Sequence, residues 1–168
     1  MIFPAATIDG EALRHNLAAV RRIAPASRVL AVIKANAYGH GIVETARALY
    51  PADAFGVARI GEGLALRAAG IRAPILLLEG VFSQDELQRA AAEQFELVIH
   101  EFTQVALLEQ PGLTHRFVVW IKLNTGMNRL GFAGDEFFEA LRRLRACAAV
   151  AQIRVMTHLA GAEEAGGE

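Results

Sequence analysis

The feature that most constrains the fold is a regular alternation of short apolar runs with longer amphipathic segments. Residues 29–33 (VLAVI) form a continuous apolar run, which is typical of a strand buried on both faces. Comparable runs begin near residues 55, 74, 97, 117 and 153. Each interval leaves room for a helix, so the pattern predicts an α/β fold with a parallel sheet and right-handed crossovers.

The intervening segments predict helices over residues 41–50, about 103–109 and 136–147, and another around residues 64–66 that ends at Gly70. Ser83 is a candidate helix N-cap, because Glu86 follows it at capping-box spacing.

Two architectures fit this pattern. A doubly wound open sheet of six strands fits 168 residues comfortably. A complete (β/α)₈ barrel needs about 200 to 250 residues, so the chain would hold only part of one. No Gly-x-Gly-x-x-Gly motif follows the first strand, which weakens the dinucleotide-binding version of the open sheet.

Composition excludes several classes of partner. The formal net charge is -1, which argues against a nucleic-acid-binding surface. No window approaches 18 uninterrupted apolar residues, so no membrane-spanning helix is predicted. Residues 1–4 lack the pattern of a signal peptide, and a single cysteine cannot build a disulfide framework. We therefore expect a cytoplasmic protein.

Lysine is unusually rare in this chain. Of 17 basic residues, only Lys34 and Lys122 are lysine, and the 32 alanines indicate a composition that favours arginine wherever charge alone is needed. Lys34 lies at the end of the first predicted strand, where chemistry gathers in parallel α/β folds. With an apolar run behind it, its amine suits imine formation, which arginine cannot perform. The alternative is a strand-end lysine that reaches into solvent.

A second group of cations follows the fifth predicted strand. Lys122 and Arg129 lie in and after residues 117–123, and two cations in one cleft indicate an anionic ligand such as a carboxylate or phosphate. The alternative is a solvated loop whose cations pair with nearby acids. His158, just past the sixth strand, is a lone histidine of the kind that is more often structural than catalytic.

Two motifs carry a resemblance to a known family. Residues 31–41 (AVIKANAYGHG) resemble the cofactor-lysine signature of bacterial alanine racemases, and residues 122–131 (KLNTGMNRLG) are similar to that family's second motif. The resemblance covers essentially the whole chain and implies a parallel (β/α)₈ TIM-type barrel, incomplete here. Residues 1–168 would be a partial N-terminal barrel domain of about six βα units, without the last barrel strands or the C-terminal β-domain. Residues 6–9 would pair outside the barrel.

The resemblance also implies roles for individual residues. Lys34 would hold pyridoxal 5'-phosphate as a Schiff base and act as a base on the D-alanine face. Tyr38 would donate to the cofactor phosphate, and Arg129 would contact the cofactor's phenolic oxygen and the substrate carboxylate. His158 would pack near the pyridine ring.

Lys122 is often carbamylated in this family, which turns a cation into an anion that orients the arginine. A common family variant has aspartate where this chain has Asn124, so a carbamate on Lys122 is a hypothesis for this chain.

The activity implied is interconversion of L-alanine and D-alanine by two bases on opposite faces of Cα, in a homodimer that supplies D-alanine for peptidoglycan. The family's second base is a tyrosine of the partner subunit's C-terminal domain, so we expect these 168 residues alone not to racemise alanine detectably. Two alternatives stay open within the fold, a broad-specificity amino-acid racemase and a decarboxylase-type barrel, although residues 35–41 favour the alanine enzyme. A third is a non-catalytic cofactor-binding or scaffold fragment.

Overall fold

The computed structural model describes residues 7–161 and contains one six-stranded parallel sheet. Its strands are β1 (Leu30–Val32), β2 (Ala54–Val57), β3 (Ile75–Leu77), β4 (Glu96–Ile99), β5 (Phe117–Lys122) and β6 (Val150–Met156). Its helices are α1 (Gly10–Ile23), α2 (Lys34–Tyr38), α3 (Ile42–Ala48), α4 (Ile60–Ala68), α5 (Gln84–Ala92), α6 (Phe102–Leu108) and α7 (Gly134–Ala146). The predicted alternation of strands and helices is therefore confirmed.

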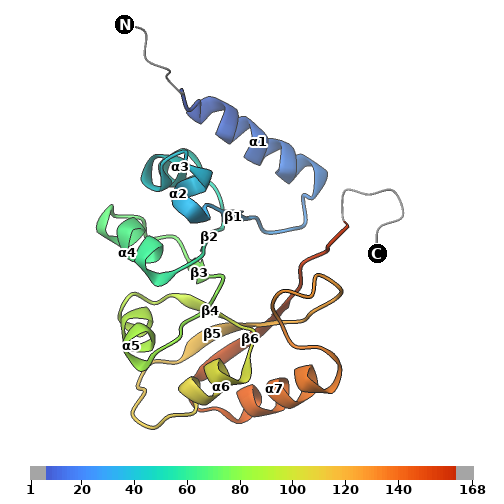
Figure 1. Ribbon diagram of the computed structural model, residues 1–168. Coiled ribbons are helices and arrows are strands. Elements are labelled where there is room, and N and C mark those ends of the chain that lie inside the picture. The colour runs from blue at the N-terminus through green and yellow to red at the C-terminus, as the bar shows by residue number, and fades with distance from the viewer. Residues whose placement is uncertain (1–6, 162–168) are drawn as a thin grey trace, which may run out of the picture.

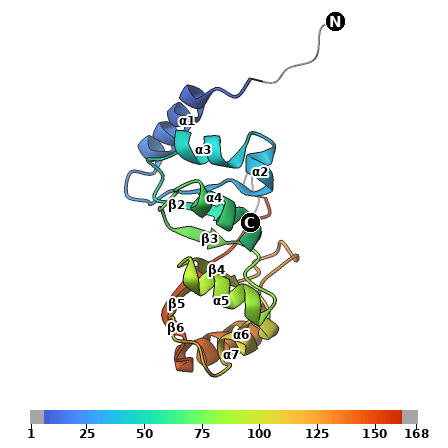
Figure 2. The same cartoon turned by 90° about the vertical axis from the view of Figure 1, so that its left-hand side faces the viewer.

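The strand order decides between the two predicted architectures. The strands lie side by side in sequence order, from β1 to β6. A doubly wound sheet reverses its direction of growth at a switch point, whereas a barrel adds each strand beside the last. Helices α3 to α7 follow one side of the curved sheet, and α1 packs on α3 (Figures 1 and 2). The fold is an α/β barrel of six strands that does not close.

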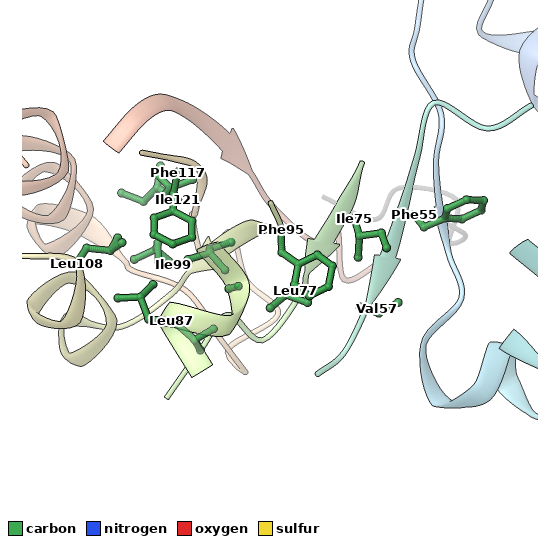
Figure 3. Packing of buried hydrophobic residues seen from close by; sticks show 14 of the residues in the cluster. Phe55, Val57, Ile75, Leu77, Leu87, Phe95, Ile99, Leu108, Phe117 and Ile121 are labelled. Atoms are coloured by element: carbon green, nitrogen blue, oxygen red, sulfur yellow. The ribbon is translucent and has the colours of Figure 1, made fainter. Parts of the chain in front are cut away.

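The apolar core lies between the sheet and its helices. In β5, Phe117, Val119 and Ile121 are fully buried in the core, where Figure 3 shows Phe117 and Ile121. The opposite face of the sheet is more polar, since the Trp120 indole N–H donates to the Glu96 carboxylate at 2.6 Å. Strand residues of one parity thus build the core, and those of the other parity line the barrel interior.

The helix ends that the sequence predicts at Ser83 and Gly70 are found in the structure. The Ser83 hydroxyl accepts from the backbone N–H of Glu86 at 3.2 Å, which confirms the predicted N-cap of α5. The Glu86 carboxylate accepts from the backbone N–H of Phe82 at 2.8 Å, one residue before the position that a standard capping box uses. Gly70, with a φ of +83°, follows α4 as predicted.

The largest difference from prediction is at the start of the chain. Helix α1 was not predicted, and Asp9 caps it by accepting from the backbone N–H groups of Glu11 at 2.8 Å and Ala12 at 3.2 Å. Residues 7–9 lead into α1 and pair with no strand of the described sheet; the pairing outside the barrel that is expected of residues 6–9 stays a prediction, and residue 6 lies outside the described residues. Strand β6 begins at Val150, earlier than predicted, beside an irregularity in its pairing with β5.

No helix among the residues placed in the structure is both long and apolar enough to cross a membrane.

Candidate functional site

The segment after β1 carries Lys34 into a left-handed turn. Residues 35–38 all have positive φ, between +53° and +55°, although none of them is glycine. A left-handed helical backbone places Cβ close to the following carbonyl oxygen and costs about 1–2 kcal/mol per residue. Such strain persists only where the surroundings hold it, and it gathers at functional sites. Gly39 and Gly41, each with a φ of +89°, end the turn and are turn residues themselves.

Contacts from two helices hold this turn. The side-chain oxygen of Asn36 accepts from the backbone N–H of Ile42, the first residue of α3, at 2.9 Å. The carboxylate of Glu62, from α4, accepts from the backbone N–H of Ala35 at 2.6 Å. Lys34 therefore begins a turn that is hydrogen-bonded to α3 through the Asn36 side chain and to α4 through the backbone N–H of Ala35.

The loop after β5 folds back onto the strand that it leaves. The Phe132 backbone N–H donates to the Lys122 carbonyl at 2.9 Å, and the Asn124 backbone N–H donates to the Phe132 carbonyl at 2.8 Å. Gly131 permits this approach, since a Cβ there would lie 2.9 Å from the Lys122 carbonyl oxygen and 3.1 Å from the Lys122 Cγ. Gly131 thus lets the loop close over the Lys122 side chain.

Asn124 organises the loop that carries Arg129. Its side-chain oxygen accepts from the Asn128 backbone N–H at 3.0 Å, while its amide nitrogen donates to the Asn128 side-chain oxygen at 3.0 Å. An aspartate could only accept, so asparagine at this position uses both halves of its amide. The hydroxyls of Thr125 and Thr157 lie 2.5 Å apart and attach the loop to the end of β6.

The electrostatics of the site are dominated by cations. Lys122 is only 8% exposed, and neither it, Lys34 nor Arg129 forms an ion pair within the described part of the chain. Burial lowers the pKa of the Lys122 amine, and the positive charges of Arg129 and Lys34 lower it further. The alternative of a loop whose cations pair with nearby acids is therefore not found, and the site suits an anionic ligand.

The lowered pKa of Lys122 predicts a pH-dependent stability. Between its folded-state pKa and the ordinary value of 10.5, the unfolded chain binds more protons at this amine than the folded one does. The free energy of unfolding contributed by Lys122 therefore rises with pH up to about that value. In buffer free of carbon dioxide, where Lys122 keeps its amine, Lys122→Met should remove this rise and stabilise the chain by about 1 kcal/mol or more near neutral pH, because no buried cation is left. Urea unfolding of both proteins from neutral to alkaline pH measures this; parallel pH profiles would contradict it.

The structure brings some of the predicted site residues together and not others. Lys34, Lys122 and Arg129 lie at the carboxyl end of the sheet, close enough for the charges of Lys34 and Arg129 to lower the pKa of the Lys122 amine. Tyr38, at the end of the left-handed turn, is 61% exposed, and His158 is exposed just beyond β6. Between residues 7 and 161, no hydrogen bond joins either side chain to the three cations.

Two polar residues of the site were not predicted. Glu62 is the third residue of α4, a position where a carboxylate usually caps its own helix, so its bond to the turn after β1 could not be read from the sequence. Thr157 follows β6 and ties the end of that strand to the loop after β5. No sequence pattern marks Thr157.

Known proteins resemble this chain in sequence and in fold. The family described as alanine racemase, N-terminal domain, matches residues 8–168. An alanine racemase from Nitrosococcus oceani is 51% identical over 165 residues, which is 98% of this chain and 46% of that relative, so the chain spans about half the relative's length. The biosynthetic alanine racemase of Pseudomonas aeruginosa superposes with a TM-score of 0.87 at 40% identity, over 92% of this chain and 43% of that one. A histidine racemase from Leuconostoc mesenteroides gives a TM-score of 0.81 at 27% identity, over 94% of this chain and 43% of that one. The chain belongs to the alanine racemase family and matches its N-terminal domain.

Proposed function

We propose that this chain is the cofactor-binding barrel portion of an alanine racemase in which Lys34 binds pyridoxal 5'-phosphate covalently. The observation that carries the proposal is the position of Lys34, a primary amine at the carboxyl end of β1. A primary amine forms a Schiff base with an aldehyde, which a guanidinium cannot do. We propose further that residues 1–168 belong to one barrel domain, since all six strands form a single sheet in sequence order.

The residues present fit this cofactor by the chemistry of their side chains. Arg129 and Lys122 supply positive charge without an acidic partner in the range 7–161, which suits the phenolic oxygen and phosphate of the cofactor or the carboxylate of an amino acid. Tyr38 is the last residue of the turn that begins at Lys34, and its side chain is exposed, so its hydroxyl is available to donate to the phosphate. His158 follows β6 at the same edge of the sheet and would pack near the ring.

When bound, pyridoxal phosphate draws electrons from the substrate Cα, so that its proton becomes removable. Lys34 Nζ would take or return that proton on one face of Cα. Arg129 would hold the substrate carboxylate and fix the orientation of the Cα–H bond. Racemisation needs a second proton-transferring group on the opposite face, and the homodimer expected from the family resemblance would supply it.

Lys122 is proposed to carry a carbamate. The reaction joins the neutral amine nitrogen to the carbon of carbon dioxide and releases a proton, so a lowered pKa favours it. The product is an anion, which would attract Arg129 where the ammonium repels it. Crystallographic density beyond Nζ is the expected sign of this group, and a bare amine would contradict it.

Alanine is proposed as the substrate, with D-alanine supply for peptidoglycan as the role. The alanine racemases of Nitrosococcus oceani and Pseudomonas aeruginosa, at 51% and 40% identity, support alanine over a broad-specificity racemase of the same fold. A cytoplasmic location belongs to the same proposal and is supported by the family resemblance.

The proposal is tested by covalent capture. The chain is incubated with pyridoxal 5'-phosphate, reduced with borohydride and mapped by peptide mass spectrometry. With only two lysines in the chain, the expected result is one adduct, on the peptide that contains Lys34. An adduct confined to Lys122 or the N-terminal amine, or no adduct at all, would contradict the proposal.

A further inference from the structure

Glu62 lies where two successive βα units of the barrel meet. One carboxylate oxygen accepts from the backbone N–H of Ala58 at 2.7 Å, ahead of α4. The other accepts from the backbone N–H of Ala35 at 2.6 Å and lies 3.4 Å from that of Asn36. A single side chain thus caps α4 and reaches the left-handed turn that follows Lys34.

The next two units of the barrel show what capping alone requires. Glu86 is the third residue of α5, as Glu62 is of α4, and its carboxylate accepts from the backbone N–H of Phe82 at 2.8 Å. Gln104 is the third residue of α6; its side-chain oxygen accepts from the backbone N–H of His100 at 2.9 Å, and its amide nitrogen donates to the Glu79 carbonyl of the preceding unit at 2.8 Å. Capping therefore needs one oxygen only, and an amide provides it as well as a carboxylate does.

The second oxygen of Glu62 is therefore not needed to cap α4. It lies against a turn in which Ala35 and Asn36 hold positive φ without glycine's freedom. Hydrogen bonds from backbone N–H groups to a carboxylate are stronger than those to neutral acceptors. A glutamine at position 62 could still cap α4 through its oxygen, but its amide nitrogen would then face the Ala35 N–H, donor against donor.

We propose that Glu62 is a positioning residue for Lys34: its carboxylate holds the left-handed turn that aims the lysine amine into the site. This inference rests on the proposed function of Lys34 as the cofactor-binding amine. Glu62 itself contacts backbone N–H groups only and acts through the turn.

The test measures the rate at which pyridoxal 5'-phosphate is captured at Lys34 in the full chain, by borohydride reduction and peptide mapping. Glu62→Gln should slow capture by about tenfold, because the bonds to the turn are lost while the cap of α4 is kept. Hydrogen exchange at the Ala35 amide should quicken in the same variant. Glu62→Asp, which keeps the charge but shortens the side chain, should also slow capture and serves if the glutamine variant folds poorly.

Two controls distinguish positioning from a general effect on stability. Glu86→Gln changes the matching residue of the next unit and should leave capture at Lys34 unchanged. Adding Ala35→Gly to Glu62→Gln should restore part of the rate, because glycine adopts the left-handed backbone without steric cost. Loss of the α4 cap alone would not be rescued by a change in the turn.

The outcomes separate this inference from the proposed function. Equal capture by the unchanged chain and Glu62→Gln, or equal slowing by Glu86→Gln, would overturn the role of Glu62 and leave the proposed function standing. No capture at Lys34 in the unchanged chain would overturn the proposed function and this inference with it.

Discussion

Replacement of Lys34 by arginine is expected to abolish the borohydride-stabilised adduct with pyridoxal 5'-phosphate. Arginine keeps the positive charge at the carboxyl end of β1 but has no primary amine, so it cannot form a Schiff base. The side chain is half-buried and forms no ion pair within the structure's described range, so the fold should tolerate the change. Peptide mapping after reduction measures the adduct, and circular dichroism checks the fold.

Lys122→Met is the matched control, because it removes the other lysine and leaves Lys34 in place. Its adduct should still map to the peptide that contains position 34. An undiminished adduct in Lys34→Arg, carried by Lys122 or by the N-terminal amine, would show that the chemistry at position 34 is not what captures the cofactor.

Gly80→Ala is expected to destabilise the chain by about 2–5 kcal/mol. Gly80 is buried after β3 with a φ of +69°, and a Cβ there would overlap the Val98 carbonyl oxygen and lie 2.6 Å from the Gln104 side-chain nitrogen. That nitrogen donates to the Glu79 carbonyl at 2.8 Å, so the collision would also disturb the hydrogen bond that joins the end of β3 to α6.

Gly70→Ala separates the two causes of this effect. Gly70 also has positive φ, +83°, but a Cβ there meets nothing within 4 Å. It should cost only the backbone penalty, about 1 kcal/mol. Urea unfolding of the three proteins measures the difference, and equal losses at the two glycines would show that the close contacts around Gly80 do not matter.

Much of the fold could be predicted because its signals are local. A run such as residues 117–123 has the length and apolar character of a buried strand, and Ser83 with Glu86 marks a helix start within four residues. Helix α1 was missed because no apolar strand precedes it, although Asp9 stands at its N-cap. The choice between an open sheet and a barrel depended on strand order, which is a relation between distant segments.

The site divides in the same way. The sequence by itself indicated which residues to expect in the site: two lysines in an arginine-rich chain and an arginine in a glycine-bounded loop from their positions, and a tyrosine and a histidine from the family resemblance. Only the tertiary structure decided how they are held. The left-handed turn after Lys34 costs energy in isolation and is stabilised by Glu62, which is 27 residues from Ala35 along the chain. Likewise, the pKa of Lys122 is lowered by its burial and by charges brought from β1 and from the loop after β5. Both effects arise between segments that meet only when the sheet forms.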